Sequence, residues 1–598
     1  MNNKSTRRMD IDFLKGLSIL VVVIYHLGFL KSGYLGVDVF FVIAGFLTVP
    51  KVVKQITDQQ FSYIKFIWNR IIRFLPAVVL GSILCLVIGL FFWLPDDYEN
   101  LAQSVIASTA FSNNILSAIT TKNYWNSLND YKPLMHLWYL GILMQFYIVF
   151  PLITLLLKNI SSVCKKNSKT MILWGYWVIS ILSFVLFLLP NISTGNRFYM
   201  LPFRFYELMF GGIVGLMVTG KESTNPNLCK WISYGTLFAL VGILFIGVFT
   251  FDPSSIGVAT VIIGGESQTS ELLLPNVVLV PLTVLLTCVL MYTSASNRLF
   301  DKTRVLPFLG KRSYSIFIWH QILLALYRYS ISSTITARFM IGYLIILCII
   351  SELSYRIIEL KITARQSIIT VICAFAVCAF SGVIYIRAGV VRDVPELGIY
   401  VDDVHRGMHA EYCDRIYSYD KDFETTDKLK VLIIGNSFAR DFGNILLESE
   451  YDDIELSYSF DFKDSLIDRI GQADRIFVFA ARDSIPDYLW ANVKSEDIVY
   501  GIGTKNFGKL NGQIYFNRFK NSYFEQTVAL DPGYKAVNEK LKSQWGNHYI
   551  DMMEIVESNG EIRIFTDTNM YISQDALHLT VAGAQYYSKM LNLEELLF

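Results

Sequence analysis

The segment LMHLWYLGILMQFYIVFPLITLL, residues 134–156, contains no Asp, Glu, Lys or Arg in 23 consecutive positions. A helix of about 20 apolar residues spans the roughly 30 Å hydrocarbon core of a bilayer, so this segment is predicted to cross a membrane. Similar stretches recur through the first 390 positions and then stop. We count eleven predicted spans, near residues 13–31, 34–50, 75–95, 134–156, 170–190, 202–219, 231–250, 275–293, 313–332, 337–358 and 368–387.

The composition of the whole chain points to the same class. Its 598 residues are 53% hydrophobic, and the net charge is +1. A chain this apolar and this long is typical of a membrane protein with more than one domain. No basic stripe with interleaved aromatic residues occurs, so we expect no nucleic-acid partner.

The charges of the loops predict the orientation, because Lys and Arg in short loops stay on the cytoplasmic side. Lys and Arg precede the first predicted span and recur in loops 51–74, 157–169 and 294–312. Loop 251–274 contains acidic residues and no Lys or Arg. With an odd number of spans, everything after Gly389 is then extracellular. Only one of the eight cysteines lies there, which favours a bacterial cell membrane over a eukaryotic secretory route.

The chain after the last predicted span changes character. Residues 1–390 form the predicted membrane domain, and residues 391–427 are polar and read as a linker. In residues 428–598, β-rich runs at 431–434, 475–479 and 498–500 alternate with helix-compatible stretches such as 536–544. This pattern predicts a three-layer α/β domain with a mainly parallel sheet.

A candidate catalytic serine follows the first of these β-rich runs, in the tripeptide Gly-Asn-Ser at 435–437. A serine at the start of a helix lies beside backbone N–H groups that can stabilise a developing negative charge. Ser437 is therefore the predicted nucleophile, with His578 as its base and Asp575 orienting the imidazole from three positions earlier. The alternative is that Ser437 only caps a helix and His578 is a surface residue.

These motifs resemble the SGNH hydrolase/esterase superfamily over residues 428–598. The resemblance implies an oxyanion hole that is completed by a glycine N–H and an asparagine side chain. Asn506, in the segment 503–508, is the candidate asparagine, and the glycine is not assigned. The more usual Gly-x-Asn-Asp sequence is absent, so Asn506 has the alternative role of holding its own loop.

The predicted membrane domain has ionisable residues of its own. Lys15 and His26 share one helix face and lie about 16 Å apart along its axis. Lys15 near the cytoplasmic end suits a phosphate, and His26 lies deeper, where a base can work in a dry site. The alternatives are a lysine that extends to the membrane surface and a histidine bonded to a neighbouring helix.

Four further residues are candidates, and each has a simpler structural alternative. Arg70 and Arg73 are neighbours at i, i+3 and are predicted to grip a phosphate together, or to be ordinary cytoplasmic charge. His136 and His320 lie in or beside apolar spans, where a histidine is a functional candidate by default. Structural hydrogen bonding is the alternative for both.

These residues lie in motifs that resemble the acyltransferase-3 family over nearly all of the predicted membrane domain. Asp38 lies in one of these motifs and joins the candidates. Many members carry a glutamate shortly before Gln-Phe-Tyr, where this chain has Leu143 and Met144. The motifs are DIDFLK (10–15), YH (25–26), GVDVFFVIAGF (36–46), Arg70-x-x-Arg73, HLW (136–138), QFY (145–147), SYS (313–315) and WH (319–320).

The fusion resembles peptidoglycan O-acetyltransferases of Gram-positive bacteria. The resemblance implies that acetyl-CoA donates inside, with Lys15, Arg70 and Arg73 near its phosphates and His26 assisting. The acetyl group then crosses the bundle, loads Ser437, and passes to a hydroxyl of peptidoglycan muramic acid. No metal is expected. Teichoic acid or capsule as the acceptor, an extracellular acetylesterase, and a non-enzymatic transporter or sensor are the alternatives.

Overall fold

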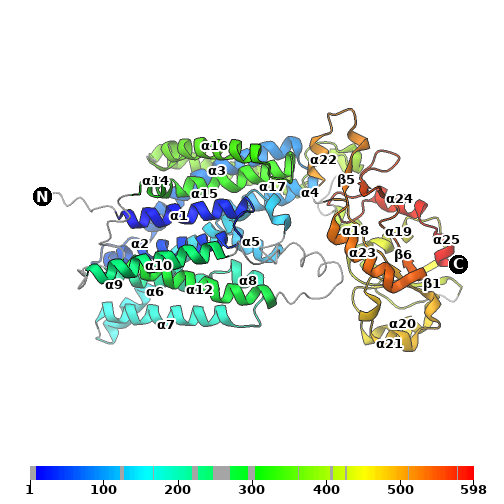
Figure 1. Cartoon of the computed structure of the whole chain (residues 1–598), viewed down its shortest axis with the longest axis horizontal. Coiled ribbons are helices and arrows are strands. Elements are labelled where there is room, and N and C mark those ends of the chain that lie inside the picture. Colours follow the sequence, from blue (N-terminus) through cyan, green and yellow to red (C-terminus); the bar gives the residue numbers. More distant parts are fainter. Residues whose placement is uncertain are drawn as a thin grey trace.

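The chain folds into a helical N-terminal region and a C-terminal α/β domain that lie end to end (Figure 1). We call the end of the helical bundle that faces the α/β domain the domain end, and the opposite end the far end. Most of loop 251–274, which contributes to the predicted orientation, lies outside the described residues. The computed structural model describes residues 8–120, 127–165, 167–218, 226–246, 270–293, 303–360, 363–403, 408–424, 427–508, 511–575 and 577–598.

Long helices make up the N-terminal region. Within the described ranges, nine are long and apolar enough to cross a membrane, in agreement with a multi-pass membrane protein. They contain α2 (Gly36–Thr57), α3 (Tyr63–Phe92), α6 (Trp138–Val163), α7 (Ser168–Leu188), α9 (Leu201–Val218), α10 (Pro226–Ile246), α12 (Ser270–Thr293), α16 (Ala337–Ser354) and α17 (Ala364–Ile386). Each of them overlaps a predicted span.

The other two predicted spans, 13–31 and 313–332, correspond to α1 (Met9–His26) and α15 (Ser313–Ser330). Both are largely buried in the bundle, but they carry polar residues, so length and composition do not mark them as spans. The count of eleven therefore stays a prediction. The remaining helices of this region are α4 (Pro95–Thr109), α5 (Asn113–Thr120), α8 (Thr194–Tyr199) and α14 (Val305–Lys311).

Glycines allow α2 and α9 to approach at backbone distance. A Cβ on Gly45 of α2 would overlap the carbonyl oxygen of Leu208 in α9, and one on Gly211 of α9 would overlap that of Val42. Small residues at such crossings let membrane helices pack closely where no hydrophobic force drives them together. These two glycines therefore fix the spacing of a central helix pair.

The α/β domain is built on a parallel sheet with strand order β2-β1-β3-β4-β6, so the predicted parallel α/β arrangement is confirmed. Val431 to Ile434 are fully buried, as expected for a strand covered on both faces. The strands are β1 (Leu429–Ile434), β2 (Ile454–Ser459), β3 (Arg475–Val478), β4 (Val499–Ile502) and β6 (Tyr549–Ile550), and a small antiparallel sheet has β5 (Thr527–Ala529), β7 (Glu557–Ser558) and β8 (Glu561–Arg563).

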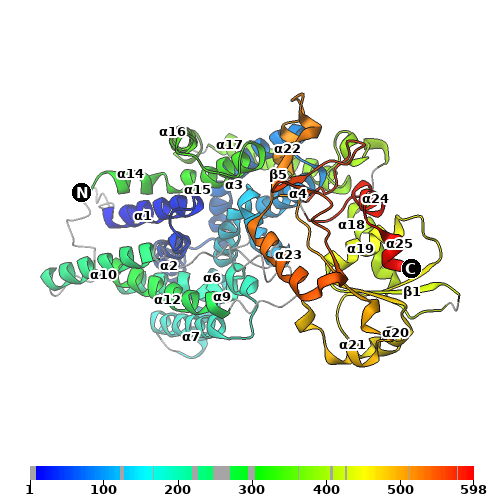
Figure 2. The same cartoon turned by 45° about the vertical axis from the view of Figure 1, so that its right-hand side comes forward.

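Helices cover the parallel sheet. In Figure 2, α19 and α24 lie on one side of β1, and α20 and α21 lie on the other. Part of the predicted linker also packs here, because Arg415 donates to Asn444 of α19 and pairs with Glu448, the residue that follows this helix. The helices are α18 (Met408–Asp414), α19 (Ser437–Leu447), α20 (Ile467–Gln472), α21 (Asp487–Asn492), α22 (Gly512–Phe516), α23 (Pro532–Trp545), α24 (Val581–Met590) and α25 (Leu593–Leu597).

The α2–α9 crossing predicts the effect of one added methyl group. Gly45→Ala should lower the free energy of unfolding by roughly 1–3 kcal/mol, because the backbone of α9 must shift to make room. Gly242→Ala is the matched control, since no atom lies within 4 Å of a Cβ at that position in α10. We expect thermal unfolding in detergent to show a lower Tm for the first variant only. Equal Tm values would contradict the close crossing.

Candidate active site

A sharp turn joins β1 to α19 and presents Ser437. Gly435 has φ +137°, and a Cβ there would lie 3.1 Å from Ala439 and from Phe479, so glycine is needed for both conformation and space. Asn436 caps the helix, because its side chain accepts a hydrogen bond from the backbone N–H of Phe438 at 3.0 Å. The cap role therefore falls to Asn436, and Ser437 is the first residue of α19.

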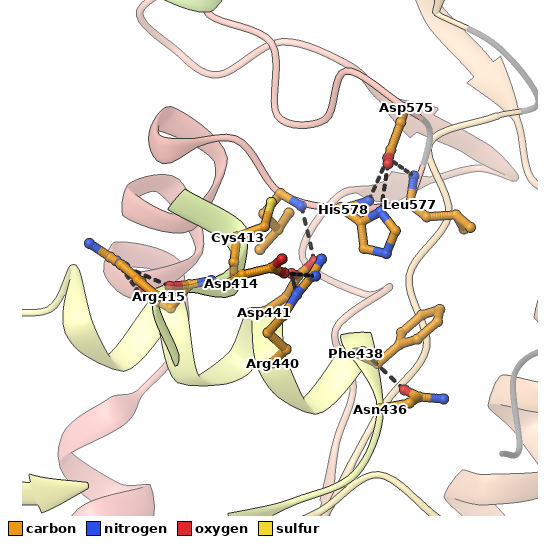
Figure 3. A network of polar contacts seen from close by, with 12 residues as sticks. Cys413, Asp414, Arg415, Asn436, Phe438, Arg440, Asp441, Asp575, Leu577 and His578 are labelled. Atoms are coloured by element: carbon orange, nitrogen blue, oxygen red, sulfur yellow. Dashed lines mark hydrogen bonds and ion pairs between the residues drawn. The ribbon is translucent and has the colours of Figure 1, made fainter. Parts of the chain in front are cut away.

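Asp575 holds the ring of His578. The Nδ1–H group of His578 donates to Oδ2 of Asp575 at 2.5 Å, and Oδ1 accepts from the backbone N–H groups of Leu577 and His578 (Figure 3). Removal from water raises the pKa of Asp575, but the His578 ring and these hydrogen bonds outweigh it and hold the pKa well below its usual range. The carboxylate thus stays ionised and directs Nε2 of His578 away from itself.

The loop that carries His578 lies against the helix that begins with Ser437. The backbone N–H of Leu579 donates to Asp441 at 3.0 Å, and Asp441 is one helical turn after Ser437 on the same face of α19. Figure 3 shows His578 above the first turn of α19, near Asn436 and Phe438. The structure thus places the His578 loop beside the helix that begins with Ser437, and no hydrogen bond joins these two described side chains.

A buried ion pair attaches the segment of Asn506 to the same helix. Nζ of Lys505 lies 2.8 Å from Asp441, with both side chains 1% exposed, and 4.2 Å from the Phe438 ring centre. Asn506 itself accepts from the N–H of Gly508 at 3.1 Å and donates to its carbonyl at 3.4 Å. Its amide is thus engaged within its own loop, and the oxyanion role stays a prediction.

A cavity of about 560 Å³ lies at the far end of the bundle. Ser367, at the start of α17, lines it, whereas the other end of α17 leads into the α/β domain. Ser367 puts the cavity at the start of α17, and Figure 1 shows the α/β domain beyond the other end of this helix. Among the residues that line the cavity, Lys15, Arg73 and Lys311 bear positive charge, and Asp12 and Glu359 contribute carboxyl groups.

Arg70 does not accompany Arg73 into this cavity. α3 begins at Tyr63, well before the predicted span, and both arginines lie on it. The guanidinium of Arg70 stacks 5.1 Å from the ring centre of Phe66 and 4.8 Å from that of Tyr147. The structure brings Lys15 and Arg73 together at one cavity, and it directs Arg70 toward aromatic rings.

The three candidate histidines of the bundle, His26, His136 and His320, lie next to one another. The ring centre of His320 lies 5.1 Å from that of His26 and 5.3 Å from that of His136, and all three side chains are buried. His320 donates from Nδ1 to the carbonyl oxygen of Phe317 at 2.7 Å, and its Nε2 has no hydrogen-bond partner among the described residues. Since His26 ends α1 and Lys15 lies at the cavity, this histidine cluster is nearer the domain end than the cavity is.

Asp38 has a structural partner that the sequence interpretation missed. Its carboxylate lies 2.6 Å from Arg204, which also lies 2.9 Å from Glu207, and all three side chains are buried. Charges are stable in such surroundings only when they are paired. The sequence does contain a signal for this charged cluster, because Arg204 and Glu207 are ionisable residues inside a predicted span.

Comparisons with known proteins agree with these observations. Two Staphylococcus aureus proteins are similar: "Putative O-acetyltransferase SACOL0978" of strain COL, 30% identical over 362 residues, 58% of this chain and 56% of that protein, and "O-acetyltransferase OatA" of strain NCTC 8325 / PS 47, 25% identical over 365 residues, 59% of this chain and 57% of that protein. The chain thus spans less than two thirds of the length of these relatives. No solved structure matches it.

The family comparison covers the bundle. The family model Acyl_transf_3, described as an acyltransferase domain, matches residues 9–356, which include the histidine cluster and most of the cavity lining. The chain therefore belongs to the Acyl_transf_3 family of acyltransferases.

Proposed function

We propose that this protein transfers acetyl groups from cytoplasmic acetyl-CoA across the membrane to hydroxyl groups of a cell-surface glycan. The observation that carries the proposal is the pair of sites at opposite ends of α17: a cavity with positive charge at the far end, and Ser437 with His578 and Asp575 in the domain beyond the other end. Two relatives named as O-acetyltransferases support acetyl as the group that moves.

The cavity suits the donor. Lys15, Arg73 and Lys311 supply the positive charge that the phosphates of acetyl-CoA require, and an arginine can grip a phosphate through two hydrogen bonds. His26, deeper along α1, assists the transfer, and its neighbours His136 and His320 mark the route toward the α/β domain. The positive charge of the loops supports a cytoplasmic position for the far end.

Ser437 receives the acetyl group on the extracellular side. Overall, the C–S bond of the thioester breaks, a bond forms between the acetyl carbon and the Ser437 oxygen, and the serine proton ends on the CoA thiol. A sugar hydroxyl then attacks the acyl-serine, His578 takes its proton and returns it to Ser437, and Asp575 stabilises the imidazolium. Asn506 is the proposed oxyanion donor.

Peptidoglycan muramic acid is our preferred acceptor, with the α/β domain acting as an SGNH-like transferase. Teichoic acid or a capsular polysaccharide is the alternative acceptor for the same chemistry. An extracellular acetylesterase is the alternative activity, but it would leave the donor cavity without a purpose. Mass analysis of surface fragments from strains with and without the protein distinguishes the acceptors.

Ser437→Ala should abolish the acetylation of the cell surface, because no acyl-enzyme can form. The measurement is the acetate that alkali releases from purified walls, compared with a strain that carries the native chain. Ser449→Ala is the matched control, since Ser449 lies just past the other end of α19, where its hydroxyl donates to the carbonyl of Leu446 and accepts from the backbone N–H of Tyr451. Unchanged acetate in the Ser437 variant would reject the proposal.

Asp575→Asn should lower kcat on the order of 10³- to 10⁴-fold, because an amide favours the wrong tautomer of His578. Hydrolysis of a soluble acetyl ester by the full-length protein measures this effect without the donor. The control is Asp567→Asn, which removes only an exposed ion pair with Arg563. Equal rates for both variants would show that Asp575 does not orient the base.

Substitutions of the two arginines of α3 should differ in their effect on the KM for acetyl-CoA. Removing a hydrogen bond to a charged group costs about 1.5–3 kcal/mol, so Arg73→Gln should raise the KM for acetyl-CoA roughly 10- to 100-fold. Arg70→Gln should leave the KM within about threefold, because Arg70 faces aromatic rings. Acetyl transfer by purified protein at varied acetyl-CoA measures both. The reverse order would place the donor at Arg70.

A further inference from the structure

The short helix α22 joins the α/β domain to the membrane bundle. A Cβ on Gly512, its first residue, would overlap the ring of Tyr329 in α15, and Gln513 donates to the carbonyl oxygen of Arg328 at 2.7 Å. Phe516, its last residue, has its ring centre 5.1 Å from that of Phe92 in α3. α22 therefore lies directly on the domain end of α15 and α3 (Figure 1).

The Tyr329 ring that α22 meets is itself fixed. It stacks on Trp93 with ring centres 4.4 Å apart, and its hydroxyl donates to Asp97 at 2.8 Å while it accepts from the backbone N–H of Leu94 at 3.1 Å. Because three groups hold this ring, it cannot turn aside for a larger residue at position 512. The absence of a side chain on Gly512 thus sets the distance between the two parts of the chain.

α22 also contacts the loop of the candidate catalytic residues. Asn511, which precedes it, is fully buried and donates to the carbonyl oxygen of Ser573. The hydroxyl of Ser573 in turn lies 3.4 Å from Asp575. The next residue, Gln574, donates to Asp96 at the start of α4. The loop of Asp575 is thus held by α22 and by the bundle at once.

On its other side, the end of α15 reaches the histidine cluster. Arg328, whose carbonyl oxygen accepts from Gln513, donates from its guanidinium to the carbonyl oxygen of His26 at 2.7 Å. His320 lies two turns earlier on the same helix. One short series of contacts therefore runs from the cluster, through the end of α15, to α22 and the loop of Asp575.

We propose that α22 is a positioning element that seats the Ser437 site on the domain end of α15, so that the acetyl group passes from the bundle to Ser437 within one docked chain and without a diffusing carrier. Gly512 and Gln513 are its positioning residues. The inference rests on the proposed function and adds the geometry of the transfer. Reacting atoms must come within about 3–3.5 Å, so a fixed interface between the two domains would favour the transfer and limit the access of water.

Two glycine variants test whether α22 holds the Ser437 site on the domain end of α15. Gly512→Ala should reduce wall acetylation at least tenfold, whereas hydrolysis of a soluble acetyl ester by the same full-length protein should stay within twofold of the native rate. Gly471→Ala is the matched control, since the nearest atom to a Cβ there is 3.7 Å away, and both activities should persist. Normal wall acetylation by the Gly512 variant, or an equal loss of both activities, would overturn the proposal.

A milder variant and a cross-link keep the test independent of folding. Gln513→Glu removes the donor to Arg328, and we expect a three- to tenfold loss of wall acetylation with unchanged ester hydrolysis. In protein carrying Asp96→Cys and Gln574→Cys, a short bismaleimide should link the two positions, as mass spectrometry of the joined peptides would show. Asp96→Cys with Gln472→Cys, on the distant α20, is the control pair.

The cross-link also separates this inference from the proposed function. If the 96–574 link forms and Gly512→Ala weakens it severalfold, the seat exists even where the native chain acetylates no wall. If the native chain acetylates walls through Ser437 but the link does not form, the function stands and the docked seat is wrong.

Discussion

A polar side chain in the hydrocarbon core has to find its partner inside the bundle, because lipid offers none. Arg204 is held between Asp38 and Glu207, and His320 bonds a carbonyl oxygen of its own helix. By contrast, Nε2 of His320 and Nδ1 of His26 have no protein hydrogen-bond partner among the described residues. Unused donors and acceptors in a dry site are costly for stability and useful for proton transfer, which is why the histidine cluster stands out from the structural pairs.

Helix length separates the two chemical sites. At a rise of 1.5 Å per residue, the 23 residues of α17 extend about 34 Å, enough to cross the hydrocarbon core. One end of α17 lines the cavity and the other leads into the α/β domain, so no single group can serve both sites. The proposed relay needs intermediate groups between the cavity and Ser437, and the histidine cluster occupies that position.

Local patterns in the sequence were sufficient for some features and not for others. Hydropathy located the long helices, and the three-residue spacing of Asp575 and His578 placed both in one turn, since such contacts lie within a few residues. The Lys505–Asp441 pair and the turning of Arg70 toward Tyr147 depend on which distant segments pack together. Two charged residues at i, i+3 are neighbours on a helix, as Arg70 and Arg73 are. Their side chains can still point to different surroundings when the helix packs against different segments on each side.

Two domains of one chain are expected to move relative to each other unless their interface is extensive. Here the contact near Gly512 depends on the lack of a side chain, on a tyrosine held by three groups and on backbone carbonyls as acceptors. Such a contact tolerates little displacement, because backbone and a fixed ring cannot adjust as long side chains do. Arg392 adds a further tie, since it donates both to Tyr515 of α22 and to the carbonyl oxygen of Leu90 in α3. The precision that acyl transfer demands is thus built into the junction, to which Arg392 of the predicted linker contributes.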